Sequence, residues 1–149
     1  MANKRAVVVM GYPVYNEEGT AQAAIKPGYL VTGTASLVVN AVAGANVARA
    51  VACERDELGA GIDNTYQGSS TISAFYASGD VVKVAVGSPG VRFTMFLASG
   101  YVVAADGKLQ AHSDGSLRPV EASQTTLFRA IDAVSAQALV PTAIRVEVM

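Results

Sequence analysis

The sequence predicts a mostly β, single-domain fold: an antiparallel β-barrel or β-sandwich with an extended N-terminal arm. The apolar content is 51%, much of it Ala and Val, and the branched Cβ of valine suits a pleated sheet. Fourteen glycines recur as turn signals about every 8–12 residues, a spacing typical of all-β domains. A chain of 149 residues is long enough to bury one core without disulfides. We therefore expect an arm over residues 1–25 and a β-domain over residues 26–149.

The arm begins with one strand-like run, Lys4 to Met10, which contains three consecutive valines. Gly11-Tyr12-Pro13 then interrupts it, because proline has no amide hydrogen for a strand ladder. From Val14 to Ala24 the pattern is weak, with turn formers at Asn16 to Gly19. We interpret this stretch as extended chain with loops, and an ordinary surface loop is the alternative.

A recurring glycine-led turn introduces the next strands. Ala-Ser-Gly-x-Val-Val occurs at Ala77 to Val82 and again at Ala98 to Val103, and Lys26 to Val31 follows a similar plan. Glycine permits the positive φ that such a turn requires, and the paired valines then enter a strand. The unequal spacing excludes a solenoid repeat.

Alternating apolar and polar residues indicate strands between these turns. Val82 to Val86 and Val91 to Phe96 are expected to form a hairpin across Gly87-Ser88-Pro89-Gly90. A second expected pair, Leu37 to Asn40 with Asn46 to Cys53, flanks Ala43-Gly44-Ala45. The remaining expected strands are Lys108 to Ala111 and Leu117 to Val120, on either side of the Asp114-Gly115 turn, and the closing run Ile144 to Val148.

Two segments allow more than one interpretation. Glu121 to Leu139 places Leu127, Ile131 and Val134 at helical spacing, but Phe128 to Val134 also reads as a strand. Periodicity alone does not separate the two for so short an apolar run. Asn64 to Phe75 is rich in Ser, Thr and Tyr, and we interpret it as a long loop.

Charge and composition exclude several functional classes. The net charge is −1 and the pI about 5.7, without the concentrated basic face of a nucleic-acid binder. No run reaches the ~20 apolar residues of a membrane span, and the run after Lys4 and Arg5 is too short for a signal-peptide core. One cysteine forms no intrachain disulfide. We expect a protein made and used without secretion that binds neither nucleic acid nor membrane. Its charged fraction of 15% favours a surface covered by neighbours.

A search for catalytic chemistry finds two side chains to consider. His112 is the sole histidine and adjoins Ser113 and Asp114, yet catalytic triads are assembled from distant segments. We interpret it as an exposed turn histidine. Cys53 is followed by Glu54 to Glu57, with a net acidic charge, whereas a reactive thiol requires cationic neighbours. We expect a small buried apolar residue there.

Metal and nucleotide sites are not predicted either. Glu54 to Glu57 with Asp63 lacks the alternating ligand spacing of a calcium loop. Gly59-Ala60-Gly61 is not followed by the helix that a dinucleotide site needs. The sequence thus predicts no enzyme, with no catalytic, cofactor-binding or metal residues and no cofactor.

A resemblance emerges from the order of the segments. They are Ile25 to Val31, Cys53 to Asp63, Tyr76 to Val84, Phe96 to Gly100, Asp114 to Leu117 and Ile144 to Val148. Over most of the chain, from about Ile25 to the end, this series resembles the head decoration, or cement, proteins of tailed bacteriophages. Each motif is a turn signal, and their joint order and spacing carry the resemblance.

The resemblance implies a compact β-barrel or β-sandwich on the outside of an icosahedral capsid. It also implies a homotrimer that clamps neighbouring subunits of the major capsid protein, with no catalytic residues. In a cyclic trimer one patch engages a different patch on the next chain, and many copies give avidity. We further expect Met1 to Ala24 to cross to a neighbouring subunit or to the capsid.

Three alternatives remain at this stage. A small β-barrel module that binds glycans or other ligands could use Tyr66, Tyr76 and Tyr101 as stacking faces, although buried or interface rings are more common. A hydrolase would depend on His112. Another minor capsid or tail role is close to the leading interpretation.

Overall fold

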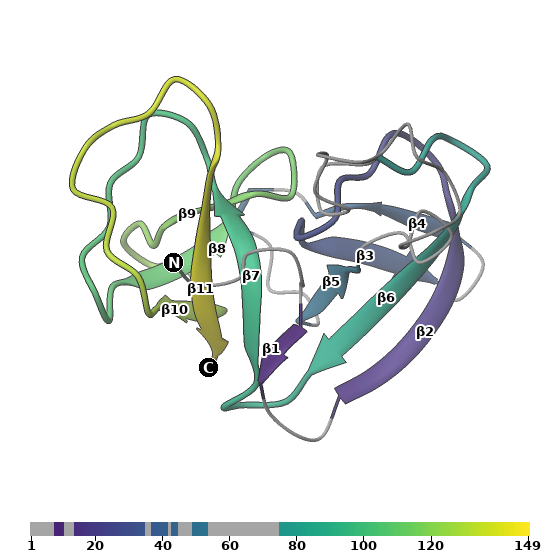
Figure 1. Ribbon diagram of the computed structural model, residues 1–149, viewed down its shortest axis with the longest axis horizontal. Coiled ribbons are helices and arrows are strands. Elements are labelled where there is room, and N and C mark those ends of the chain that lie inside the picture. The colour runs from purple at the N-terminus through teal and green to yellow at the C-terminus, as the bar shows by residue number, and fades with distance from the viewer. Residues whose placement is uncertain (1–7, 11–13, 35–36, 42, 45–48, 54–74) are drawn as a thin grey trace, which may run out of the picture.

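The computed structural model describes residues 8–10, 14–34, 37–41, 43–44, 49–53 and 75–149. In these residues the secondary structure consists of β-strands, turns and bends, with no α-helix. Two sheets lie side by side and form a single mostly-β domain, as predicted (Figure 1).

The N-terminal sheet contains five strands in the order β3-β4-β2-β6-β5. Their bounds are β2 Val14–Ala21, β3 Val31–Thr34, β4 Leu37–Asn40, β5 Ala50–Ala52 and β6 Val81–Gly87. The longest ladder is the antiparallel pairing of β2 with β6, from Val14 opposite Gly87 to Thr20 opposite Val81. β2 also meets β4 in parallel, over Thr20 and Ala21.

This sheet curls until its two ends meet. Leu30, just before β3, forms a bridge with Val51 of β5. The amide of Ala52 donates to the Tyr29 carbonyl at 3.0 Å, and the amide of Gly28 donates to the Ala52 carbonyl at 2.8 Å. The curled sheet holds its own small core of Ala21, Ile25, Val31, Ala52, Tyr76, Val82 and Val84.

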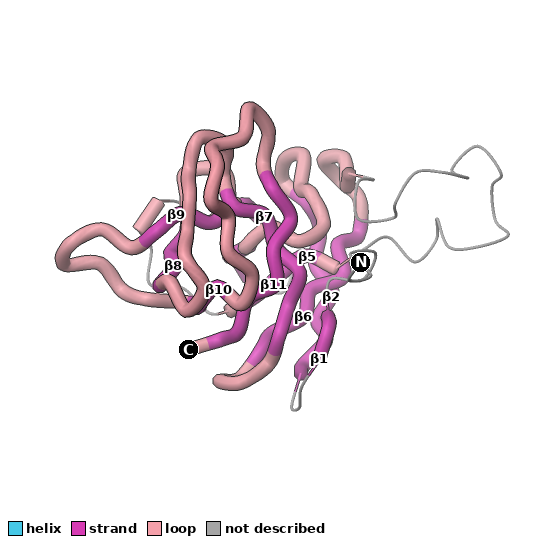
Figure 2. The backbone as a smooth tube through the Cα atoms, turned by 60° about the vertical axis from the view of Figure 1, so that its left-hand side comes forward, coloured by secondary structure: helices cyan, strands magenta, loops and turns pink. Residues whose placement is uncertain are grey.

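The second sheet is a closed barrel. Its strands follow the order β1-β7-β11-β10-β8-β9, and a further parallel contact between Leu97 of β7 and Leu117 of β9 completes the ring. Figures 1 and 2 show β7 and β11 side by side. The bounds are β1 Val8–Met10, β7 Arg92–Leu97, β8 Lys108–Ala111, β9 Leu117–Pro119, β10 Phe128–Ala130 and β11 Thr142–Val148.

Strand alternation explains the barrel core. Phe93, Met95 and Leu97 of β7 point inward, and Ile144, Val146 and Val148 of β11 do the same. Leu109, Leu117 and Phe128 complete the interior from β8, β9 and β10. The core is therefore built from residues of one face of each strand, as the period of two requires.

The interpretation of Val14 to Ala24 as an arm with loops is wrong for most of its length, because Val14–Ala21 is strand β2 inside the N-terminal sheet. Its low strand propensity is overridden by a partner, β6, that lies far along the chain. The short strand within Lys4 to Met10 is confirmed at Val8–Met10, which pairs with β7. Residues 4–7 and the Gly11-Tyr12-Pro13 break lie outside the described residues.

Two predicted hairpins are also wrong. Gly87 to Gly90 leads from β6 in one sheet to β7 in the other, and these strands do not pair. The strands around Ala43-Gly44-Ala45 exist, but β4 lies between β3 and β2 whereas β5 pairs with β6. Strand pairing depends on which apolar faces meet in space, and sequence neighbours do not always supply them.

Other strand predictions are confirmed. β8 and β9 form an antiparallel hairpin around Asp114-Gly115, and β11 contains the predicted closing run. Between Glu121 and Leu139 the structure has a strand, shorter than expected, at Phe128–Ala130. The glycine-led turn precedes β6, with φ +92° at Gly79. After Gly100 the predicted strand is reduced to one bridge, between Val103 and Val134, and 64–74 of the expected loop lie outside the described residues.

The turn of the β8–β9 hairpin joins the barrel to the N-terminal sheet. Gly115 accepts a hydrogen bond from the Leu30 amide at 2.7 Å, and the carbonyl of Ala111 accepts one from the Gly44 amide at 3.0 Å. Gly115 has φ +85° and lies so close that a Cβ would be 2.6 Å from the Leu30 carbonyl oxygen. A glycine is required at this position for both reasons.

Ion pairs cross three strands on the outer face of the barrel. The Glu147 carboxylate of β11 lies 3.0 Å from Arg92 Nε of β7 and 2.7 Å from Arg129 Nη2 of β10. These hydrogen bonds lower the pKa of Glu147, against a smaller opposing effect of burial. The ionised carboxylate therefore holds the three strands together more strongly than the protonated form does.

Replacing Glu147 with Gln should make unfolding less sensitive to acid. A lowered pKa in the folded state means that the stabilisation is complete above the ordinary pKa, near 4.5, and is lost as the pH falls through the folded-state value. We expect the melting temperature of the variant to be a few degrees lower at pH 7, with a gap that closes toward pH 3. Calorimetry from pH 3 to 8 measures this gap; a constant difference across that range would contradict the assignment.

Candidate functional site

His112 lies in a turn and does not form a triad. Its Nδ1 is 3.1 Å from Asp114 Oδ1 and 3.4 Å from Ser113 Oγ. In a triad the serine and the carboxylate lie on opposite ring nitrogens, so that one orients the ring while the other exchanges a proton. Here both face the same nitrogen. The arrangement agrees with a turn histidine, although the ring is partly covered and packs edge-on against Tyr101, with centroids 5.8 Å apart.

Asp114 has a structural task in the same turn. Its Oδ1 accepts hydrogen bonds from the amide of Ser116 at 3.0 Å and from the Ser116 hydroxyl. Burial opposes ionisation of this carboxyl, but the bonds from Ser116 and His112 outweigh it and lower the pKa of Asp114. The ionised carboxylate of Asp114 therefore stabilises the turn of the β8–β9 hairpin.

Cys53 is buried beyond the end of β5, as the sequence predicted. Glu54 to Glu57, Gly59 to Gly61 and Asp63 lie outside the described residues. In the part of the chain that the structure describes, no three His, Cys, Asp or Glu side chains come together as a metal site.

The tyrosines do not form a common stacking surface. Tyr76 is buried, and its hydroxyl donates to the Cys53 carbonyl at 2.9 Å. Tyr101 is partly buried against the barrel core, and Tyr66 lies outside the described residues. Because the Tyr76 ring is buried, it cannot stack on a glycan, and a glycan-binding surface cannot include all three rings.

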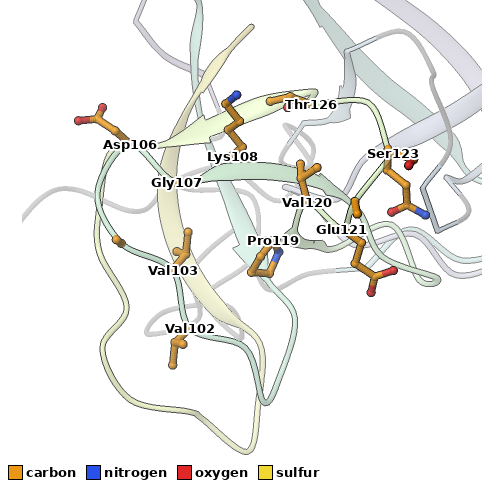
Figure 3. A pocket seen from close by; sticks show the side chains of 13 residues that line it. Val102, Val103, Asp106, Gly107, Lys108, Pro119, Val120, Glu121, Ser123 and Thr126 are labelled. Carbon is orange, nitrogen blue, oxygen red and sulfur yellow. The ribbon is translucent and has the colours of Figure 1, made fainter.

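A groove opens on the barrel beside β8 and β9. It has a volume of about 730 Å³ and lies between the loop after β7 and the segment after β9 (Figure 3). Val102 and Val103 form one side, Pro119 and Val120 form the other, and Lys108 of β8 lies at one end. The remaining lining residues are Ala104, Asp106, Gly107, Glu121, Ala122, Ser123, Gln124 and Thr126.

Backbone and side-chain contacts hold both sides of the groove. The Val120 amide donates to the Lys108 carbonyl at 3.0 Å. Arg118 pairs with Glu121 at 2.9 Å and contacts the Gln124 amide oxygen at 3.4 Å. Asp106 and Ser123 have positive φ, which is uncommon for residues other than glycine. The groove is thus built from loops held by the barrel strands.

An exposed apolar tip continues from the groove. Val102 is 43% exposed, Val140 67% and Leu139 fully exposed. Their loops are joined by a hydrogen bond from the Gly100 amide to the Ala138 carbonyl, 2.9 Å, and by the bridge between Val103 and Val134. The sequence did not indicate this surface, because Val102 fits a strand pattern and Leu139 lies at the end of a helical pattern. The signal that could have found it is Leu139-Val140-Pro141, an apolar pair before a proline.

Comparison with solved structures identifies a similar fold. The chain is similar to the N base of the head fiber gp8.5 of bacteriophage phi29, with a TM-score of 0.58 and 11% sequence identity. The alignment covers 92% of this chain and 95% of the phage one. At this identity the likeness concerns the fold. No protein-family model and no curated protein matches the sequence, and the described residues contain no helix long and apolar enough to cross a bilayer.

Proposed function

We propose that this protein is a non-enzymatic structural component of a phage virion that decorates and stabilises the outside of the capsid. One observation carries the proposal: the fold matches the base of a phage head fiber over nearly the full length of both chains. A match that includes both sheets is a stronger argument than one confined to the small barrel, because small barrels serve many functions.

The described side chains support a role in binding rather than catalysis. The one histidine fastens a turn, the one cysteine is buried, and the acidic groups Glu147, Asp132 and Asp106 are paired with arginines. The exposed features described above include a groove with both polar and apolar lining and an apolar tip. Such surfaces on a soluble domain are typical of contacts with other proteins.

In the proposed assembly the protein is a homotrimer that clamps adjacent subunits of the major capsid protein. A cyclic trimer brings different patches of neighbouring chains together. We also propose that the N-terminal residues before Val8 cross to a neighbouring subunit or to the capsid. Deleting Met1 to Ala24 is unsuitable as its test, because β1 and β2 pair with β7 and β6 inside the domain. A deletion should stop before Val8.

The proposal predicts density that depends on this protein on the outer surface of phage heads. Particles produced with and without its gene would be compared by cryo-electron microscopy, and purified protein would be added back to the deficient particles. We expect density at three-fold positions that the added protein restores, and shells that withstand heat better with it. The purified protein should have a mass in solution near three times 15.3 kDa.

Identical shells from the two strains would overturn the decoration role, and density on the tail would assign a different virion role. A monomer that still occupies three-fold positions would overturn only the preformed trimer. Add-back protein with His112→Ala is a control: its occupancy should equal that of the wild type, because the proposal gives this residue no chemistry.

A further inference from the structure

We propose that the groove beside β8 and β9 is the docking site for an extended segment that carries apolar side chains and a carboxylate that pairs with Lys108. The segment belongs to the shell protein, and in this respect the inference rests on the proposed function. It adds a defined surface and a defined partner chemistry to that function.

Part of the groove wall is apolar and would accept apolar side chains of a partner. Val102 is exposed on the loop after β7, and Pro119 and Val120 lie partly exposed on the opposite side (Figure 3). The apolar tip at Leu139 and Val140 lengthens this surface. Each exposed aliphatic side chain that becomes covered contributes to binding in proportion to its area. A partner segment with alternate apolar side chains would fill the groove.

The charges around the groove specify a carboxylate on the partner. Asp106 is paired with Arg129 at 3.2 Å, and Glu121 with Arg118 at 2.9 Å. Lys108 is exposed and forms no ion pair with any residue in the part of the chain that the structure describes. An ammonium group without a counterion, next to two neutralised carboxylates, attracts a negative group. The partner should therefore place Asp or Glu beside Lys108.

A second copy of this chain fits the groove less well. In a second copy, the segment best suited to enter the groove is the exposed apolar tip at Leu139 and Val140. The residues around that tip, 133–143, contain neither Asp nor Glu. A copy that inserted Leu139 and Val140 would leave Lys108 without a carboxylate from the same segment. Charge complementarity thus favours a different protein.

The test measures binding to empty shells assembled from the major capsid protein of the same phage. Lys108→Glu should weaken binding about tenfold, the effect of one unfavourable charge contact. Lys108→Arg should stay within about twofold because it retains the positive charge. Lys83→Glu, on β6 of the other sheet, makes the same change in net charge and should bind like the wild type. Val120→Asp should weaken binding as Lys108→Glu does, and melting curves check that each variant is folded.

A photoreactive amino acid at position 102 identifies the occupant. We expect it to capture a shell-protein peptide that contains apolar residues and an Asp or Glu. Capture of a second copy of this chain would overturn the assignment. Equal binding of wild type, Lys108→Glu and Val120→Asp would overturn the groove inference alone, because shell binding itself would persist. Wild-type protein that does not bind shells would instead overturn the proposed function and with it the groove's role.

Discussion

Replacing Gly115 with Ala should destabilise the protein by about 2–4 kcal/mol, the combined cost of an unfavourable backbone angle and of overpacking. Gly115 has φ +85°, a left-handed conformation that costs a residue with a Cβ roughly 1–2 kcal/mol. Its new Cβ would also lie 2.6 Å from the Leu30 carbonyl oxygen and 3.3 Å from the Asn40 side chain. Backbone cannot retract as a flexible side chain does, so the hydrogen bond from the Leu30 amide to the Gly115 carbonyl should be weakened too.

Gly90→Ala is the matched control for this substitution. Gly90 has a similar φ of +92°, and a Cβ there meets nothing within 4 Å. It should therefore show the backbone cost without the overpacking. Urea unfolding followed by circular dichroism gives both free energies, and their difference measures the junction between the barrel and the N-terminal sheet. Equal losses in the two variants would mean that the junction accommodates the methyl group.

Replacing Phe128 with Ala should cost about 3–5 kcal/mol, the usual penalty for removing a buried aromatic ring. Phe128 is fully buried on β10. That strand lies between β8 and β11, with Phe128 opposite Leu109 on one side and Val148 on the other. The cavity would open where three barrel strands meet, and the short strand has few ladder bonds to compensate.

Phe75→Ala provides the comparison with the same change of side chain. Phe75 is 53% exposed, and the centroid of its ring lies 5.0 Å from Lys26 Nζ. Its removal should cost about 0.5–1 kcal/mol through loss of this cation–π contact. Thermal unfolding ranks the two variants. A Phe128→Ala protein as stable as Phe75→Ala would show that the barrel core collapses around the lost ring.

Local sequence signals predicted most of the strands in the barrel. In the barrel, alternation identified Arg92–Leu97 and Thr142–Val148, and the Asp114-Gly115 turn identified the β8–β9 hairpin. In the N-terminal sheet, alternation identified Val81–Gly87. These signals work because the strands each present one face to a core. β2 had no such pattern, and its place depends on a long ladder with β6 that no local signal encodes.

The candidate site was less accessible to sequence reasoning. The groove needs residues 102–108 and 119–126 side by side, an arrangement produced by barrel closure between Leu97 and Leu117. Asp106 pairs with Arg129 and Glu121 pairs with Arg118, so neither carboxylate forms an ion pair with Lys108 among the described residues. These pairings depend on the fold and could not be read from the sequence. The turn itself could be predicted from the sequence, because the hydrogen bond between Asp114 and Ser116 lies within one local turn.

The pairing of β1 with β7 affects how the chain assembles during synthesis. The described strands of the N-terminal sheet lie between Val14 and Gly87, so they leave the ribosome ahead of β7. β1 precedes them in the chain, yet its partner spans Arg92–Leu97. Since domains begin to fold from the N-terminus as they emerge, Val8–Met10 must wait unpaired while the sheet that follows it can already form. Among the described strands, β1 is made first and yet joins its ladder only once the barrel begins.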